Sequence, residues 1–477
     1  MSLSALRPAL VSRRVALSQL AIGVGGIGLA AVLGKEGFAA EASPLLAANS
    51  APVAPHHAPR AKSLIFLNMQ GGPSQFETFD FKPAMDHYAG KAIPQELSVR
   101  FPGKILPSAF RFSRHGQSGL EISNSLPHLG TVADELCVIK SMVCDSQAHP
   151  SGQVQALTGY ARGAMPCLGS WILYGLGSAN DNLPGFVYLA NGYSHGSAFL
   201  PAETQGMPIG QKLPNVRRAA GMTEPQQREM LDLLAKVNRQ YAAEHPADDV
   251  LNARIEAAEL AFRMQVASPE AVDLTQESQA TLDLYGITDN DGLGSKTKKG
   301  GRGLSETRQD FGSMCLIARR LVERGVRVVT ICVGGRRGWD QHSNLKEALE
   351  QNCLVIDQPM AALLKDLKSH GLLDSTLVMW GGEFGRTPYA QNDNGRDHFH
   401  KGYTYWLAGG GVKGGLSYGT THELGLDVAE NKVHVHDLHA TLLWQLGLDP
   451  ERLTFRYGGR DQRLTDTSGK VVRAILT

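Results

Sequence analysis

The sequence predicts an α/β fold in which a mostly parallel central sheet is sandwiched between two layers of helices. Continuous Val/Ile/Leu-rich runs such as VRVVTICV and STLVMW read as strands buried on both faces. Helical stretches separate these runs, which implies parallel strand–helix–strand crossovers. Each run also ends abruptly at charged or imidazole side chains, so these groups should gather at the carboxyl edge of the sheet, where open α/β folds bind ligands.

Length and charge narrow the class of protein. The 477 residues are enough for one large α/β domain with a tail or for two to three smaller domains. The 47 basic and 46 acidic residues give a net charge of +1. This balance argues against a nucleic-acid partner, because such proteins usually carry a basic stripe that raises the total.

The amino terminus, residues 1–42, reads as an export signal. Arg7, Arg13 and Arg14 precede the apolar run LSQLAIGVGGIGLAAVLG, and small residues follow in GFAAEAS. The stretch SRRVAL resembles a twin-arginine signal, which predicts export by the machinery for folded proteins and a periplasmic or secreted location. An uncleaved membrane anchor is the alternative. After signal removal we expect no membrane span.

The chain then enters the predicted domain through a linker. Residues 43–61 are rich in Pro and Ala, and His56 and His57 in this linker are expected to be solvated. An α/β domain is predicted over 62–466. Its first buried strand, KSLIFL, runs into the loop NMQGGPS, whose glycines permit close backbone approach.

A second candidate centre follows the predicted strand LCVIKSM. Asp145, Ser146, His149 and Ser151 lie in a strand-to-helix loop, with a helix beginning near Ser151. Free N–H groups at a helix amino terminus attract anions, which makes this loop a candidate catalytic loop. The alternative is that Ser146 or Ser151 is an ordinary N-cap.

The middle of the chain is predicted to be mainly structural. One helix and one strand are expected within 166–216, and apolar residues at spacings of three and four predict two amphipathic helices in an insertion at about 224–265. Residues 286–303 read as a polar loop. The six cysteines form no CxxC motif and read as buried small residues, although Cys137 and Cys144 could pair.

The strongest candidate site lies within 326–400. Asp340 and His342 follow one strand, Glu383 and Arg386 follow the next, and His398 lies in the predicted loop GRDHFHKGY. Carboxylates and imidazoles collected at one sheet edge are typical of a metal site or of an acid/base site. Further along, His434, His436 and His439 recur closely in a segment that reads as extended, so at least one of these histidines is expected to face the site.

These motifs resemble those of a known family. NMQGGPSQFETFD, HGQSGLEIS, GWDQHSN, GGEFGRTP, GRDH and DLHATLLWQLGLDP, spread over Ser63 to Asp466, resemble the DUF1501 family of exported bacterial proteins, which is placed in the alkaline phosphatase/sulfatase-like superfamily. The resemblance implies an alkaline phosphatase-like three-layer sandwich. It also implies one or two metal ions at the carboxyl edge of the sheet and hydrolysis of phosphate or sulfate esters.

Carried over to this chain, the resemblance assigns Asp340, His342 and His398 as metal ligands. The sequence departs from the superfamily at three places: the first strand ends in NMQGG instead of an Asp ligand, Phe384 replaces a histidine, and the position expected for the nucleophile holds His149.

The sequence is therefore compatible with two functions. The first is a metal-dependent hydrolase of a small-molecule or glycan ester, with Zn, Ca or Mn bound by Asp340, His342, Glu383 and His398, and with His436 as a further candidate ligand. In that hypothesis His149 is the general base, Arg386 clamps the anionic group, and Ser146 and Ser151 are candidate nucleophiles. The second is a non-catalytic metal- or glycan-binding protein of the same fold.

Overall fold

A computed structural model of the chain describes residues 54–93, 103–189, 196–209, 221–244, 269–288, 304–333, 338–392 and 394–477. The predicted export signal, the start of the predicted linker and the later part of the predicted insertion lie outside these residues. The chain divides into two units, Met1–Asn49 with Lys212–Glu270, and Ser50–Gln211 with Ala271–Thr477. No helix in the described part of the chain combines the length and apolarity needed to cross a bilayer.

The larger unit is built on a nine-stranded sheet. Its strands run in the order β12, β4, β11, β8, β1, β7, β5, β6, and β15 pairs with β4. Their bounds are β1 (Ser63–Met69), β4 (Leu136–Val143), β5 (Phe186–Leu189), β6 (Met207–Ile209), β7 (Val328–Val333), β8 (Thr376–Gly381), β11 (Tyr403–Ala408), β12 (Leu416–Tyr418) and β15 (Val433–His434).

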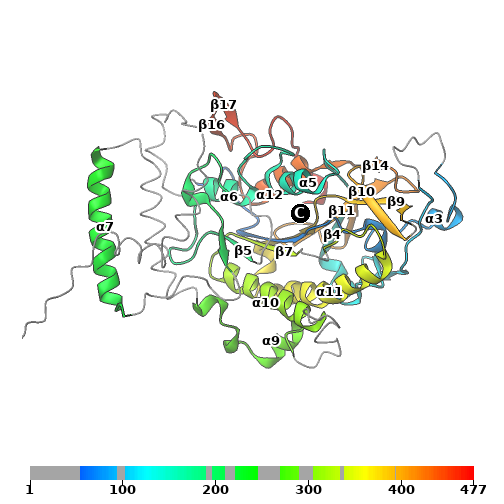
Figure 1. Ribbon diagram of the computed structural model, residues 1–477, viewed down its shortest axis with the longest axis horizontal. Helices are drawn as coiled ribbons and strands as arrows, with labels where there is room; N and C mark the ends of the chain where they lie inside the picture. The colour runs from blue at the N-terminus through cyan, green and yellow to red at the C-terminus, as the bar shows by residue number, and fades with distance from the viewer. Residues whose placement is uncertain are drawn as a thin grey trace, which may run out of the picture. The chain divides into compact units, whose positions relative to one another are not determined.

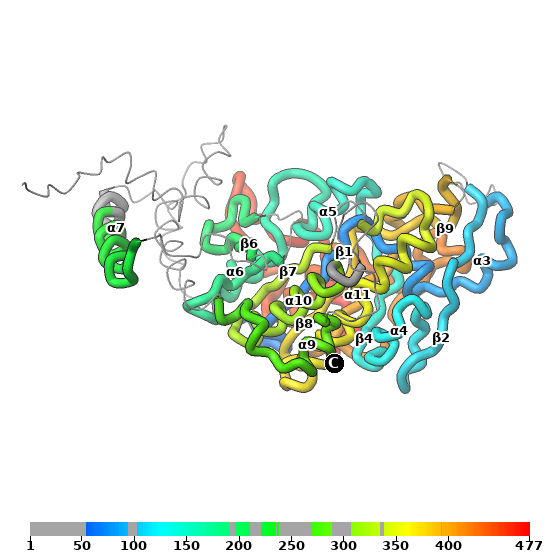
Figure 2. Tube along the Cα trace, turned by 60° about the horizontal axis from the view of Figure 1, so that its bottom comes forward, coloured from blue at the N-terminus to red at the C-terminus, as the bar shows by residue number. Residues whose placement is uncertain are grey.

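All strands of this sheet except β11 share one direction. β1 pairs in parallel with β7 on one side and with β8 on the other, so that Ile65 lies opposite both Val329 and Val378. Figure 2 shows β1 and β7 side by side. Every residue of β1 is buried, as expected of a strand covered on both faces. β11 is antiparallel to both β4 and β8.

Helices cover both faces of the sheet (Figure 1). One layer contains α9 (Gln279–Leu284), α10 (Leu304–Glu323) and α11 (Leu345–Ser369), and the other contains α5 (His149–Thr158), α6 (Leu168–Leu176) and α12 (Val435–Gln445). The predicted fold class, an α/β sandwich with a mostly parallel central sheet, is therefore confirmed. Two short helices are α3 (Ala84–His87) and α4 (Pro127–Gly130), and α4 packs against α11, where Asp357 accepts the backbone N–H groups of His128 and Leu129.

Four two-stranded sheets complete the larger unit. Their strands are β2 (Phe112–His115) with β3 (Leu120–Ser123), β9 (Gly385–Gln391) with β10 (Gly395–Phe399), β13 (Thr420–Thr421) with β14 (Val428–Glu430), and β16 (Phe455–Tyr457) with β17 (Arg460–Gln462). The segment around His398 was expected to be a loop, but it is strand β10 of an antiparallel hairpin with β9, in which His398 pairs with Arg386.

The smaller unit contributes one described helix, α7 (Glu224–Glu244). It begins directly after Thr223, whose side chain contacts Gln226 in the first turn, and it ends before Pro246. This is the first of the two helices predicted for the insertion. The second falls outside the described residues.

Two expectations about small features are wrong. All six cysteines are free and buried, so Cys137 and Cys144 do not pair. His56 and His57 are not simply solvated linker residues: Nδ1 of His56 accepts the backbone N–H of Asp449 at 2.9 Å, and the ring of His57 lies 4.1 Å from that of Trp444. Residues 56–61 are thereby held against the end of α12.

Candidate metal centre

The candidate site lies at the carboxyl edge of the central strands. Asp340 and His342 follow β7, Glu383 follows β8 after one further residue, and His149 is the first residue of α5, in the connection after β4. His398 comes from hairpin strand β10. Because β4, β7 and β8 point the same way, their ends bring these side chains together, as the sequence predicts for this edge.

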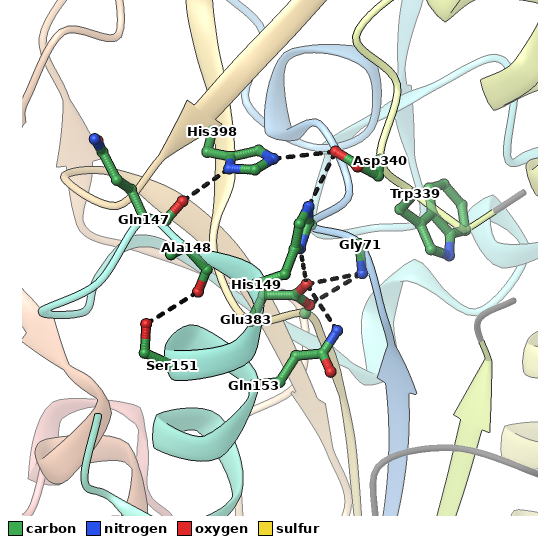
Figure 3. Close-up of polar contacts among 12 residues, drawn as sticks. Gly71, Gln147, Ala148, His149, Ser151, Gln153, Trp339, Asp340, Glu383 and His398 are labelled. Carbon is green, nitrogen blue, oxygen red and sulfur yellow. Dashed lines mark hydrogen bonds and ion pairs between the residues drawn. The ribbon is translucent and has the colours of Figure 1, made fainter. Parts of the chain in front are cut away.

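Three histidines converge on one carboxylate oxygen, and Figure 3 shows two of them, His149 and His398, directed at Asp340. The Nε2 atoms of His149, His342 and His398 lie 3.0, 2.8 and 3.1 Å from Oδ1 of Asp340. One ligand atom from each of these four residues lies within 4.8 Å of all the others. Ligands bound to one tetrahedral Zn²⁺ at about 2 Å stand roughly 3.3 Å apart, so this spacing suits a shared ion.

The other ring nitrogen of each histidine is held by an oxygen atom. Nδ1 of His149 donates to Oε1 of Glu383 at 2.6 Å, and Nδ1 of His398 donates to the carbonyl of Gln147 at 2.8 Å. Nδ1 of His342 contacts Oε1 of Gln391. Since a carboxylate or carbonyl oxygen can only accept, Nδ1 carries the proton and the lone pair of Nε2 faces the cluster. Metal-binding histidines are oriented in this way.

Three lone pairs facing one carboxylate oxygen repel one another unless a positive charge lies among them. Nε2 of His342 and Nε2 of His398 are only 3.1 Å apart, and the buried Nε2 of His149 has no hydrogen-bond partner of good geometry among the described residues. These four residues therefore fit a cation, and in its absence the cluster must take up protons.

The pKa shifts of His149 and Asp340 agree with a cluster that needs positive charge. Burial lowers the pKa of His149, but the neighbouring carboxylates of Asp340 and Glu383 outweigh burial and raise the pKa to about 9. Partial burial raises the pKa of Asp340, but contacts with His149, His398 and Arg386 hold it well below its usual range. A proton and a metal ion compete for the same lone pairs.

Glu383 lies behind His149 and does not join the four-residue cluster. Its side chain is 0% exposed. Its Oε1 atom accepts the Nδ1–H of His149, the backbone N–H of Gly71 at 2.9 Å and the side-chain N–H of Gln153 at 3.2 Å (Figure 3). A buried carboxylate needs such donors, and here they leave it oriented toward the ring of His149. The structure thus places Glu383 next to a candidate ligand.

Arg386 is equally buried, which corrects its expected role as a clamp for substrate. The side chain is 0% exposed, and its guanidinium donates to the carbonyls of Gly72 at 2.9 Å and Trp339 at 3.1 Å. It also donates to Oδ1 of Asp340 at 2.7 Å. With its donors directed into the protein, Arg386 cannot reach an anion in solvent, and it fixes Asp340 instead.

The expected nucleophiles and His436 are not part of this cluster. The hydroxyls of Ser146 and Ser151 lie 2.6 Å from each other, and Ser151 turns toward the carbonyl of Ala148 (Figure 3). Nδ1 of His436 lies 2.6 Å from the Ser468 hydroxyl, and its Nε2 lies 2.6 Å from the carbonyl of Gly159.

The expectation of an extended segment around His436 is wrong, because α12 begins at Val435 and places His436 in a helical turn. His434 is the N-cap of α12, where its side chain accepts the backbone N–H of His436.

Sequence reasoning did not identify Gln391 or the carbonyl of Gln147 as partners of the histidines. Gln391 is the last residue of β9, and only recognition of the β9–β10 hairpin would have placed it beside His342. Backbone carbonyls carry no side-chain signal. His149 was assigned to proton transfer, although its position at the same sheet edge as Asp340 was visible in the sequence.

The fold and the site together define an α/β protein with a candidate metal centre at the carboxyl edge of its sheet. Residues 61–476 match the family described as "Protein of unknown function (DUF1501)", and the chain belongs to that family. The resemblance of the sequence motifs to DUF1501 is thus confirmed.

Several solved structures are similar to this chain. A sulfatase from Pseudoalteromonas sp. is 13% identical over 93% of this chain and 73% of that chain, with a TM-score of 0.35. A phosphonate monoester hydrolase from Silicibacter pomeroyi is 12% identical over 74% of this chain and 72% of that chain, with a TM-score of 0.33. An alkaline phosphatase superfamily protein from Vibrio parahaemolyticus is 11% identical over 91% and 75%, with a TM-score of 0.35. No curated protein matches the chain.

Proposed function

We propose that this chain is a metal-dependent hydrolase of phosphate or sulfate esters, sugar-derived esters included. The observation that carries the proposal is the convergence of His149, His342 and His398 on Asp340 while all three Nδ1 atoms are held by oxygen atoms. The ester class comes from the resemblance to the alkaline phosphatase/sulfatase-like superfamily.

The donor set favours Zn²⁺ among the expected ions. Three imidazole nitrogens and one carboxylate oxygen are ligands typical of zinc, and Mn²⁺ is the second choice. Ca²⁺ takes six to eight oxygen ligands in most proteins, so three nitrogens disfavour it. The expected ligand set is revised accordingly, with His149 taking the place of Glu383 and His436 left out.

In this proposal the ion performs the chemistry, and Glu383 and Arg386 orient two of its ligands. A divalent ion acts as a Lewis acid that polarises an ester and offsets charge on the leaving oxygen. Glu383 orients the ring of His149, and Arg386 fixes Asp340. The side chains of Asp340 and His342 are 41% and 33% exposed, which leaves the centre open to a substrate from solvent.

The test combines metal content with turnover. The purified protein should contain about one equivalent of a divalent ion by elemental analysis. Chelation should abolish hydrolysis of an aryl phosphate or aryl sulfate, and Zn²⁺ or Mn²⁺ should restore it. His342→Ala should lose both the ion and the activity, whereas the exposed His87→Ala should keep both. A metal-free protein, or full activity after chelation, would refute the proposal.

A non-catalytic metal- or glycan-binding protein is the second candidate. It is favoured by the position of the serines, because Ser146 and Ser151 bond to each other and to nearby backbone instead of to a histidine of the cluster. A protein that binds Zn²⁺ and a glycan, yet hydrolyses no member of a broad panel of phosphate and sulfate esters, would support this alternative.

We also propose that the chain is exported by the twin-arginine route to the periplasm or beyond. The proposal rests on Arg13 and Arg14 before the apolar run. Replacing both with Lys should retain the protein in the cytoplasm, as judged by cell fractionation. Unchanged export would refute it.

A further inference from the structure

A second concave site lies at the opposite edge of the sheet from the candidate metal centre. It is a cavity of about 340 Å³ whose lining includes His57, Arg60, Trp444, Gln445, Arg473 and Thr477. Arg60 precedes β1, and Trp444 and Gln445 are the last residues of α12. The cavity therefore belongs to the amino-terminal edge of the parallel strands, while the metal centre follows their carboxyl ends.

Two arginine side chains line the cavity and form no ion pair with a described side chain. Arg60 and Arg473 are exposed, and the side chain of neither forms a hydrogen bond or an ion pair with any described residue. The backbone around them is fixed, since the N–H groups of Arg60 and Ala61 donate to the carbonyl of Gln445, both at 2.8 Å. Two guanidinium groups thus lie at one cavity without an anionic side chain bonded to them among the described residues.

The indole of Trp444 contacts the side chains of Arg473 and His57. The guanidinium carbon of Arg473 lies 4.3 Å from the indole centroid, within the range of a cation–π contact. The ring of His57 lies 4.1 Å from the same indole at an interplanar angle of 32°. Nε2 of His57 is buried without a hydrogen-bond partner among the described residues. Trp444 thus holds the guanidinium of Arg473 at the cavity.

We propose that this cavity binds a tetrahedral oxyanion, phosphate or sulfate, as the terminal group of a small molecule. Guanidinium groups match the oxygens of such groups with paired hydrogen bonds, and Arg60 and Arg473 both line the cavity. A volume of about 340 Å³ falls within the range of ligand pockets and leaves room for an organic part beside the anion. The inference goes beyond the proposed hydrolysis and does not depend on it.

Calorimetric titration of the full chain tests the site, with inorganic phosphate, inorganic sulfate and glucose 6-phosphate as probes and glucose as the uncharged control. The protein carries His342→Ala, so that the candidate metal centre is removed. Binding of the inorganic anions indicates an ion site. Tighter binding of glucose 6-phosphate indicates the expected phosphorylated or sulfated ligand, and either result supports the oxyanion chemistry.

Arg60→Gln and Arg473→Gln should each weaken binding by about tenfold or more, because each removes charge-assisted hydrogen bonds. The matched control is Arg162→Gln, an exposed arginine in the segment after α5, which should leave binding unchanged. The proposal is overturned if no probe binds, or if all three variants weaken binding equally, which would indicate general attraction of anions to a basic surface. Retained binding in both cavity variants would overturn it as well.

Discussion

Glu383→Gln separates two roles for the most buried carboxylate of the site. The substitution keeps the size of the side chain and an oxygen acceptor, but it removes the negative charge that faces Nδ1 of His149 at 2.6 Å. If Glu383 orients His149 from behind, as its contacts indicate, the affinity for Zn²⁺ should fall about 10- to 100-fold. This range corresponds to about 1.4 to 2.7 kcal/mol of binding free energy.

The same substitution should also destabilise the metal-free protein. The carboxylate accepts N–H groups from Gly71, His149 and Gln153 in an environment without solvent, and the amide that replaces it brings N–H groups of its own toward these donors. An unmatched buried donor costs about 1 to 3 kcal/mol. Thermal unfolding of the metal-free variant measures this cost separately from metal binding.

Competition with a chelating dye gives the Zn²⁺ affinity for the wild type, Glu383→Gln, His149→Ala and the exposed Glu451→Gln. The ligand variant should lose far more affinity than the orienting variant, and the exposed control should lose none. A loss in Glu383→Gln as large as that in His149→Ala would show that Glu383 is itself a ligand, as the sequence alone indicated. Unchanged affinity in Glu383→Gln would refute any coupling to the ion.

Three further predictions concern stability. Gly71→Ala should destabilise the fold strongly in urea unfolding, because Gly71 has φ +114° and an added Cβ would lie 2.5 Å from the backbone N of Trp339. The control is Gly90→Ala, where φ is +72° and the space around the residue is open. This control should show only backbone strain of about 1 kcal/mol. Arg386→Lys should lower the midpoint of thermal unfolding, since one ammonium cannot replace a guanidinium bonded to several carbonyls and to Asp340, and an unchanged midpoint would contradict the assigned contacts. Burial lowers the pKa of His439 to about 3, so stability that is complete above pH 6.5 is lost as the pH falls toward 3. His439→Gln should reduce the slope of unfolding free energy against pH in this window by up to about 1 kcal/mol per pH unit, and an unaltered slope would exclude a neutral buried His439.

The fold could be predicted from the sequence because two independent signals identify its central strands. Runs such as those of β1, β7 and β8 are continuously apolar, and each is followed by polar groups that must lie at a sheet edge. Strand order was not predictable in the same way. β11 lies between β4 and β8 and runs against both, and nothing in its composition distinguishes an antiparallel strand from a parallel one when both faces are buried.

The members of the site were easier to predict than their roles. Asp340, His342 and His398 were expected together, and the structure brings them together with His149. The role of Arg386 was not predictable, because a guanidinium next to a carboxylate reads the same in the sequence whether it faces solvent or a row of backbone carbonyls. His436 was placed by an assumed extended conformation, and one turn of helix redirected it toward Gly159.

The loop after β1 has no room for the carboxylate that the sequence resemblance implies at the end of the first strand. Gly71 cannot carry a side chain, since its φ is +114° and an added Cβ would meet the backbone of Trp339 and Asp340. The loop therefore contributes its backbone: the N–H of Gly71 binds Glu383, which arrives from the neighbouring strand β8. Glu383, which follows β8, thus adds a second carboxylate at this edge beside Asp340, and it contacts the ring of His149. Placing a carboxylate at position 71 should therefore fail to rescue Glu383→Gln, because no side chain fits there.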